Sequence, residues 1–272
     1  MDMIDYSKYL REKKFPLIWC PGCGHGIVMK AIIRAIDRVG WKRDDMVMVS
    51  GIGCSSRMPG YVDFNTLHTT HGRAIAFATG IKLANPRLHV VVVTGDGDAT
   101  AIGGNHYIHA ARRNIDLTVI LMNNYIYGMT GGQVSPTTPM GKMASTAPYG
   151  NLEPSFNVSG LAEAAGATFV ARSTAFHATQ LENFIVKALE KKGFSVVEAM
   201  SPCPTVYGRR NKLRGGVQML EDLKERSVSV KKAASMTREE LENAVVTGVI
   251  VDIDKPEYTE QYERLIASLQ KG

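Results

Sequence analysis

The sequence predicts an α/β protein built on a doubly wound parallel β-sheet. Apolar runs that are typical of strands alternate with amphipathic segments that are typical of helices, and this succession indicates helices on both faces of a parallel sheet. The strand-like runs are nearly continuous in β-branched and other apolar residues, as expected for strands that are covered on both faces. The chain has 272 residues, which is enough to bury a sizeable core in one large domain with an appendage, or in two small domains.

Hydrophobic periodicity and glycine positions place the elements in order. Gly40 and Gly193 are suited to end the helices before them, and Thr179 with Glu182 matches a capping box at the start of the later helix. Residues 128–159 are rich in Gly, Pro, Ser and Thr, which predicts a long loop that is either functional or disordered. The expected elements are a helix over 24–39, a strand over 46–50, a helix over 74–83, a strand over 88–94, a helix over 99–113 weakened by two glycines, a strand over 117–122, a helix from 179 and a strand over 194–199.

The pattern changes toward the C-terminus. A charged segment is followed by a helix with Thr237 and Glu240 in capping-box positions, by a short strand over residues 245–253 and by a last helix. We therefore expect a main domain over residues 1–215 and a C-terminal tail or small subdomain over residues 216–272.

Composition excludes several classes of function. The net charge of +6 is mild and suits an acidic protein partner or anionic substrates. Basic residues do not cluster with aromatic ones, so we expect no nucleic acid partner. The acidic start of the chain lacks the apolar core of a signal peptide, and no run approaches the roughly 20 apolar residues that span a membrane. We expect a cytoplasmic protein, in which the four cysteines serve metal or redox chemistry rather than disulfides.

A glycine–aspartate run, Gly-Asp-Gly-Asp at residues 95–98, follows directly on a predicted buried strand. Open α/β sheets bind ligands at this end of their strands, where glycines allow a phosphate to approach the backbone. Asn123-Asn124 ends the next strand, with Asn124 placed 28 residues after Asp96. Magnesium prefers oxygen ligands and commonly completes its shell with phosphate and water. Either motif alone is equally well explained as a turn, but together they predict a diphosphate site with a divalent metal.

The four cysteines also lie near predicted turns and strand ends. Cys20 and Cys23 form a C-x-x-C motif, Cys54 follows the first strand and Cys203 follows the strand over 194–199. These positions can converge on one edge of the sheet, where four thiolates would bind a [4Fe–4S] cluster or zinc. Unrelated buried thiols remain an alternative for Cys54 and Cys203, because free cysteine is often buried.

The spacing of Gly-Asp-Gly and Asn-Asn resembles the signature of the thiamine diphosphate enzymes. The resemblance implies a sheet of the thiamine-diphosphate-binding type. It also implies that Asp96, the Asn124 side chain and the Ile126 backbone carbonyl hold Mg²⁺ against the diphosphate. Gly128 and Met129 would then lie beside the cofactor.

A wider set of motifs is similar to the β subunit of the 2-oxoacid:ferredoxin oxidoreductases, over about residues 17–208. The motifs are Trp-Cys-Pro-Gly-Cys-Gly-His-Gly at 19–26, Ile-Gly-Cys-Ser at 52–55, His-Gly-Arg-Ala at 71–74, Gly-Asp-Gly-Asp at 95–98 and Thr-Gly-Gly-Gln at 130–133. The resemblance implies a [4Fe–4S] cluster on the four cysteines. The cofactor-binding residues that we expect are Cys20, Cys23, Cys54, Cys203, Ile52, Gly53, Ser55, His25, Gly95, Asp96, Gly97, Asp98, Gly128 and Met129.

The family chemistry is the oxidative decarboxylation of a 2-oxo acid, with CoA as acceptor of the acyl group and ferredoxin as acceptor of the electrons. Thiamine supplies the electron sink for such a reaction. The resemblance implies a partner α subunit, in an α2β2 complex, that provides the carboxylate activating the aminopyrimidine ring. This chain would then carry the cofactor in residues 1–215 and be inactive alone.

Two further residues are candidates for catalysis. His71 precedes a helix in His-Gly-Arg and is expected to contact the cofactor, although a lone histidine is more often a core residue. Arg57 follows the Cys54 loop and is either a surface arginine or a clamp for a second substrate carboxylate, since arginine forms bidentate pairs with carboxylates. The clamp favours 2-oxoglutarate over pyruvate. The alternatives are a pyruvate-specific or broad-specificity enzyme, a non-oxidative thiamine-dependent decarboxylase or carboligase subunit, and a zinc-stabilised binding module.

Overall fold

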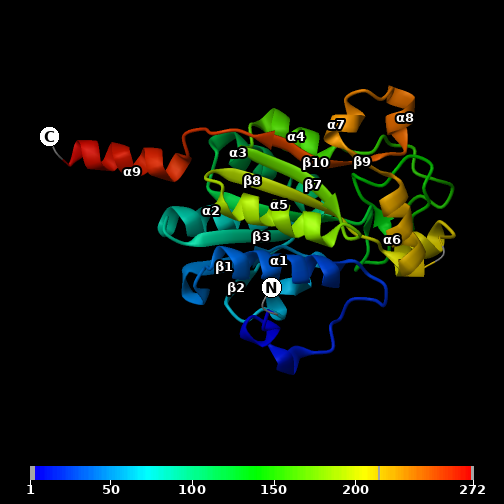
Figure 1. Ribbon diagram of the computed structural model, residues 1–272, viewed down its shortest axis with the longest axis horizontal. Coiled ribbons are helices and arrows are strands. Elements are labelled where there is room, and N and C mark those ends of the chain that lie inside the picture. Colours follow the sequence, from blue (N-terminus) through cyan, green and yellow to red (C-terminus); the bar gives the residue numbers. More distant parts are fainter. Residues whose placement is uncertain (1–3, 214, 271–272) are drawn as a thin grey trace.

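Helices cover both faces of a central β-sheet in the computed structural model, which describes residues 4–213 and 215–270 (Figure 1). The strands are β1 (Met46–Ser50), β2 (Asn65–His68), β3 (His89–Gly95), β4 (Leu117–Asn123), β5 (Ile126–Tyr127), β6 (Gln133–Val134), β7 (Phe169–Thr174), β8 (Phe194–Met200), β9 (Ser227–Ser229) and β10 (Val245–Asp252). The α-helices are α1 (His25–Val39), α2 (Ala74–Ala84), α3 (Gly104–Arg113), α4 (Val158–Ala165), α5 (Ala178–Glu190), α6 (Gly215–Glu225), α7 (Val230–Ala233), α8 (Arg238–Glu242) and α9 (Tyr258–Leu269).

The main sheet confirms the predicted fold class. Within the described residues its strand order is β2-β1-β3-β4-β8-β7-β10-β9. The six strands from β2 to β7 in this order are mutually parallel. Only β10 runs antiparallel to its neighbour β7, and β9 is parallel to β10. The near-continuous apolar runs are the central strands of this sheet, and β4 and β8 are buried along their whole length.

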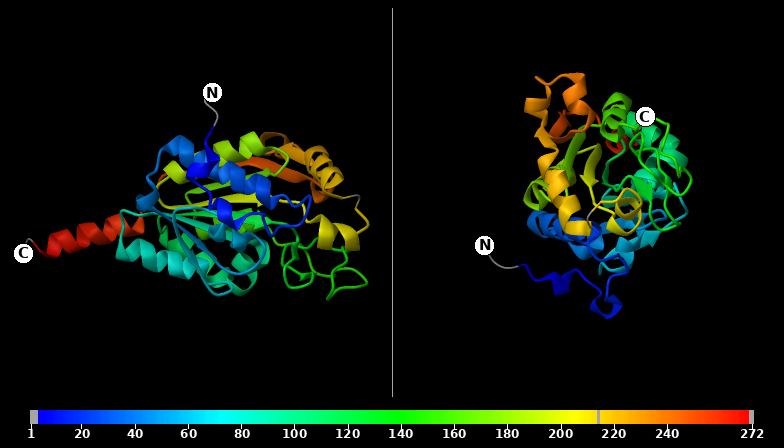
Figure 2. Two further views of the ribbon diagram at one scale, coloured as in Figure 1. Left: turned by 90° about the horizontal axis from the view of Figure 1, so that it is seen from below. Right: turned by 90° about the vertical axis from the view of Figure 1, so that its right-hand side faces the viewer.

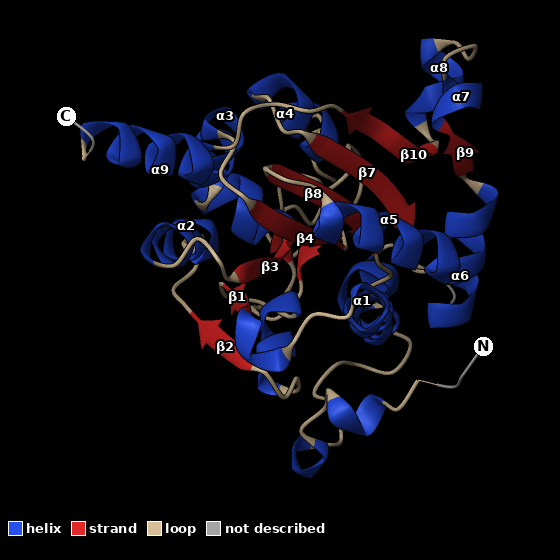
Figure 3. Cartoon of the chain, turned by 60° about the vertical axis from the view of Figure 1, so that its left-hand side comes forward, coloured by secondary structure: helices blue, strands red, loops and turns tan. Residues whose placement is uncertain are grey.

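Two apolar cores lie on opposite faces of the sheet. Helices α1 and α5 pack on one face against the inward side chains of β1, β3, β4 and β8. Helices α2, α3 and α4 cover the other face, and the two layers are separated by the sheet in Figures 2 and 3. Successive side chains of each central strand point into opposite cores. Odd and even positions of these strands are therefore both apolar.

The register of the central strands brings their carboxyl ends to one edge. Ser50 at the end of β1 pairs with Val93 of β3, and Gly95 at the end of β3 pairs with Met122 of β4. Asn123 at the end of β4 pairs with Met200 at the end of β8. The loops that follow these four strands therefore leave the sheet side by side, and they carry the motifs identified in the sequence.

Several local expectations need correction. The helix expected over 99–113 is divided into a π-helical turn, Asp98–Ile102, and α3, which begins at Gly104. The capping box predicted at Thr179 is wrong. Helix α5 follows His177, and the Glu182 side chain pairs with Arg34 and Arg38 of α1 instead.

Several elements have no counterpart among the expected ones, and these include the sheet strands β2, β7 and β9 and the helix α4. The edge strand β2 is short and partly exposed, so it lacks the continuous apolar pattern of the central strands. The loop expected over 128–159 is ordered. It begins with the β5–β6 hairpin and ends in the first turn of α4.

The C-terminal segment contributes to the main sheet. The strand expected over 245–253 is β10, and its antiparallel pairing with β7 joins residues of the expected tail to the main sheet. The capping box of Thr237 and Glu240 is confirmed at the start of α8. Helix α9 extends away from the body at the edge opposite the motif-bearing loops (Figure 1).

Candidate cofactor site

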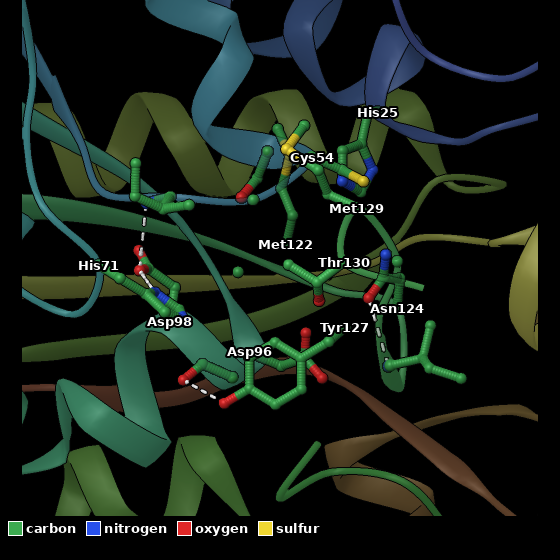
Figure 4. A pocket seen from close by; sticks show the side chains of 17 residues that line it. His25, Cys54, His71, Asp96, Asp98, Met122, Asn124, Tyr127, Met129 and Thr130 are labelled. Atoms are coloured by element: carbon green, nitrogen blue, oxygen red, sulfur yellow. Dashed lines mark hydrogen bonds and ion pairs between the residues drawn. The ribbon is translucent and has the colours of Figure 1, made fainter. Parts of the chain in front are cut away.

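A pocket opens at the carboxyl edge of the sheet, among the loops that follow β1, β2, β3 and β4 (Figure 4). Its lining contains most of the residues predicted to bind cofactor or metal. The lining residues are His25, Ile52, Gly53, Cys54, Ser55, His71, Gly95, Asp96, Gly97, Asp98, Met122, Asn124, Ile126, Tyr127, Gly128, Met129 and Thr130. Of the predicted site residues, Cys20, Cys23, Cys203 and Arg57 lie outside this lining.

Asp96 is one of two buried aspartates that line the pocket. Its side chain is 3% exposed, and its Oδ2 accepts hydrogen bonds from the hydroxyls of Ser135 and Thr137, both at 2.5 Å. Burial raises the pKa of Asp96 to about 6, although the hydrogen bonds from Ser135 and Thr137 act in the opposite direction. A carboxylate that is costly to bury gains from a cation beside it, so this environment suits a metal ligand.

The two asparagines at the end of β4 have different surroundings. Asn124 lines the pocket and is 6% exposed. Its Oδ1 accepts a long hydrogen bond, at 3.4 Å, from the backbone N–H of Ile126. Asn123 points away and is fixed: its Nδ2 donates to Glu198 at 2.8 Å, and its Oδ1 accepts from the backbone N–H of Tyr125 at 3.1 Å. Asn124 is therefore the candidate metal ligand, and Asn123 holds the turn.

Glu198 of β8 holds this turn in place through its hydrogen bond with Asn123. Its side chain is 2% exposed and also accepts hydrogen bonds from Arg172 Nε at 2.8 Å and from the Ser159 hydroxyl at 2.5 Å. Burial alone would raise the pKa of Glu198, but the Arg172 charge and the hydrogen bonds outweigh it and lower the pKa. A charged Glu–Arg pair inside the protein thus supports Asn123, although no signal in the sequence linked these residues.

Asp98 ties together three of the loops that form the pocket. Its Oδ1 accepts from the backbone N–H groups of Ile52 at 3.2 Å and Gly72 at 2.7 Å, and Thr94 donates to Oδ2 at 2.7 Å. His71 Nδ1 also bonds Oδ1, as Figure 4 shows. Asp98 is nearly fully buried and lines the pocket, but these contacts make it an organiser of the loops. They also direct the other ring nitrogen of His71, Nε2, away from Asp98.

The four cysteines lie around one end of the pocket. The C-x-x-C turn is attached to the loop after β8, because Gly24 N–H donates to the Pro202 carbonyl at 3.2 Å. A Cβ atom added at Gly128 would lie 3.3 Å from Cys54 Sγ and 3.8 Å from Cys203 Sγ. Glycine at this position therefore leaves the space that the two sulfurs border.

The thiols also interact electrostatically. The pKa of Cys23 is raised to about 12, chiefly by burial and in part by the charges of the other three cysteines. Burial likewise raises the pKa of Cys54 to about 11, again with contributions from Cys203 and Cys20. These mutual effects indicate that the four thiols lie in the same region of the structure. Thiols of this kind release protons when they bind a cation.

The donor set bears on the kind of metal centre. Four cysteine thiolates are the ligand set of a [4Fe–4S] cluster and also of a structural zinc ion, so the residues present fit either centre. Among the described residues, no three His, Cys, Asp or Glu side chains are grouped closely enough to hold one metal ion.

His25 lies between the cysteines and the pocket. Its ring is 1% exposed, its Nδ1 is 2.9 Å from the Ser201 hydroxyl, and burial lowers its pKa to about 4. The imidazole is thus neutral near neutral pH. Trp19 contacts the His25 ring edge to face and donates from Nε1 to the Cys54 carbonyl at 2.6 Å. These contacts connect the C-x-x-C segment to the Cys54 loop.

Arg57 lies outside the pocket lining. Arg57 is exposed on a 3₁₀ turn, Ser55–Gly60, that begins at the pocket residue Ser55.

Three residues of the site were not predicted from the sequence. Tyr127 lines the pocket, donates to the Gly97 carbonyl at 3.1 Å and contacts the His71 ring. Ser135 and Thr137 were also missed. Their only signal was the Ser/Thr-rich composition of the loop, which names no partner.

Comparisons with known proteins agree with this geometry. The family described as thiamine pyrophosphate enzyme, C-terminal TPP binding domain, matches residues 51–199. The chain is 56% identical over 263 residues to the 2-oxoglutarate synthase subunit KorB of Methanocaldococcus jannaschii, covering 97% of both chains. It is 46% identical over 189 residues to the 2-oxoacid:ferredoxin oxidoreductase subunit beta of Saccharolobus solfataricus, covering 69% of this chain and 62% of that one. The chain belongs to the β-subunit family of the 2-oxoacid:ferredoxin oxidoreductases.

A solved structure supports the same assignment. The 2-oxoglutarate:ferredoxin oxidoreductase from Magnetococcus marinus, with 2-oxoglutarate, coenzyme A and succinyl-CoA bound, superimposes with a TM-score of 0.87 at 34% identity, over 99% of this chain and 92% of that one. Membership of this family makes the chain a subunit of an oxidoreductase, and a β subunit implies an α partner. None of the helices in the described residues has the length and apolar character needed to cross a membrane.

Proposed function

We propose that this chain is the cofactor-bearing β subunit of a 2-oxoglutarate:ferredoxin oxidoreductase that converts 2-oxoglutarate and CoA to succinyl-CoA. The main support is the convergence, at one sheet edge, of a diphosphate-metal motif and four cysteines. The names of the most similar relatives and the ligands of the Magnetococcus marinus enzyme support the choice of substrate.

Asp96, Asn124 and the Ile126 carbonyl are proposed to hold Mg²⁺ against the cofactor diphosphate. The buried carboxylate with its raised pKa and the amide beside it are hard oxygen donors of the kind that Mg²⁺ prefers. Thiamine diphosphate, when bound, supplies the electron sink for decarboxylation. In this pocket His71, held by Asp98, presents a ring nitrogen, and the loop residues Gly128 and Met129 are proposed to lie beside the cofactor.

Cys20, Cys23, Cys54 and Cys203 are proposed to ligate a [4Fe–4S] cluster. The proposal is supported by two observations: Cys54 and Cys203 border the same space beside Gly128, and the C-x-x-C turn is hydrogen-bonded to the loop that carries Cys203. Cys54 lines the pocket, so a cluster held by Cys54 would lie beside the cofactor site. Short separation between an electron donor and a cluster favours rapid one-electron transfer, and ferredoxin is the proposed acceptor.

The remaining parts of the enzyme are proposed to come from an α subunit, in a cytoplasmic α2β2 complex. The exposed arginine Arg57 beside the pocket is a candidate for recognising the second carboxylate of 2-oxoglutarate, with the α subunit completing the substrate site. A pyruvate-specific or broad-specificity enzyme is the competing reading and differs only in this recognition.

The test is anaerobic purification of the chain with its α partner, followed by iron, sulfide and thiamine diphosphate analysis. We expect about four iron and four sulfide per β chain, bound thiamine diphosphate, and CoA-dependent ferredoxin reduction that is faster with 2-oxoglutarate than with pyruvate. A colourless protein that contains zinc would refute the cluster. Decarboxylation that needs neither CoA nor ferredoxin would indicate the non-oxidative class instead.

A further inference from the structure

The segment between β5 and α4 contacts the proposed metal site at two places along its length. Its first residues, including Gly128, line the pocket. A few residues later Ser135 and Thr137, which are 2% and 1% exposed, reach the carboxylate of Asp96 from outside the pocket lining. Both hydroxyls donate to the same oxygen, Oδ2. They therefore hold that oxygen toward the loop, whereas Oδ1 accepts no hydrogen bond from a side chain of the described residues.

Thr137 stands between the ends of β3 and β4. Its Oγ1 is 2.5 Å from Asp96 Oδ2 and 2.9 Å from Asn123 Oδ1. One hydroxyl proton serves one acceptor at a time, and the ionised, nearer carboxylate is the stronger acceptor. Asn123 Oδ1 retains the backbone N–H of Tyr125. The side chain of Thr137 is thus packed against the two strand ends that carry the proposed metal ligands.

We propose that Ser135 and Thr137 are positioning residues for the metal, which fix the Asp96 carboxylate so that Oδ1 is presented to the cation. The inference rests on the proposed function, because it assumes that Asp96 is a ligand. Without these donors the carboxylate is free to rotate, and cation binding must then restrict that rotation. Partners that orient metal ligands in this way typically change metal affinity by about 10- to 100-fold when they are removed.

The coupling also works in reverse. If Oδ2 anchors the loop while Oδ1 binds the cation, then cation binding stabilises the arrangement that the loop requires. Amide exchange around residues 134–138 should therefore slow when the metal binds. This response belongs to the positioning role, because a purely structural pair of hydroxyls would protect these amides equally with and without metal.

The experiment uses the full chain with its α partner, stripped of divalent metal, in the presence of thiamine diphosphate. Mn²⁺ serves as the probe, and free Mn²⁺ is counted by its EPR signal. We expect Thr137→Val and Ser135→Ala each to raise the Mn²⁺ Kd by about tenfold, and Thr137→Ser, which keeps the hydroxyl, to stay within about threefold of wild type. The matched control is Thr118→Val, which removes a buried hydroxyl that donates to the Ala188 carbonyl at 3.1 Å, far from Asp96.

The outcomes separate the two proposals. Wild-type protein that binds thiamine diphosphate without any need for Mn²⁺ would overturn the metal site of the proposed function, and this inference with it. Wild type that binds Mn²⁺ tightly, with Thr137→Val and Ser135→Ala within twofold of it, would overturn the positioning role alone. If Thr137→Val proves much less stable than Thr118→Val, the milder Ser135→Ala decides the question by the same criterion.

Discussion

Replacement of Glu198 by glutamine should strongly destabilise the protein although it changes only one polar group. The substitution keeps the shape of the side chain but removes its charge, and Arg172, whose side chain is 16% exposed, loses its buried partner. Breaking a buried ion pair by removing one partner costs about 3–5 kcal/mol. We expect a value near the lower end, about 3 kcal/mol, because Arg172 keeps its hydrogen bond to Asn157 Oδ1 at 3.1 Å. For a chain of this size that lowers Tm by roughly 6–12 °C.

The dependence on pH provides a second test of the same reasoning. The folded-state pKa of Glu198 is lowered, so the stabilisation from its charge is fully present above the unfolded-state pKa, about 4.3. It is lost as the pH falls through the folded-state pKa. The gap in Tm between wild type and Glu198→Gln should therefore be full at neutral pH and shrink below about pH 4.

The assay is thermal unfolding of the full chain, followed by circular dichroism across this pH range. Glu182→Gln is the matched control. The Glu182 side chain is also buried, at 7% exposed, but the two arginines that it pairs with are 45% and 47% exposed. Their charges stay hydrated when Glu182 is neutralised, so we expect a loss of about 1 kcal/mol. Equal Tm values for the two variants, or a gap that persists unchanged in acid, would show that the buried pair does not have the assigned role.

Three further predictions concern the site. Asp96→Ala and Asn124→Ala should each abolish Mg²⁺-dependent binding of thiamine diphosphate without unfolding the chain, and equilibrium dialysis that finds full cofactor retention would contradict the ligand assignment. Serine at any one of the four cysteines should lower iron content, so a variant with unchanged iron and an unchanged reduced-state EPR signal identifies a cysteine that is not a ligand. Arg57→Ala should lower kcat/KM for 2-oxoglutarate by roughly ten- to a hundredfold, with a much smaller effect on pyruvate. An equal fall for both acids would mean that Arg57 supports the loop rather than recognises the substrate.

The sequence by itself predicted the fold class and most of the residues that line the pocket. The central strands are long enough and apolar enough to be recognised one at a time, and parallel strands place all their carboxyl ends on one edge. The motifs that follow β1, β3, β4 and β8 are therefore expected at the same edge of the sheet. This expectation does not depend on the path of the chain between the strands. Local signals such as the Thr237 capping box were also reliable where they compete with no tertiary contact.

The partners of the site residues were decided only by the tertiary structure. Ser135 and Thr137 are 39 and 41 residues from Asp96 along the chain, and Arg172 is 26 residues from Glu198. Local propensity acts over a few residues and contains no information on which distant hydroxyl will meet a buried carboxylate. The same limit explains Glu182, whose apparent capping role was overridden by two arginines on another helix. Burial makes each such polar group acquire a partner, but the path of the whole chain decides which partner it is.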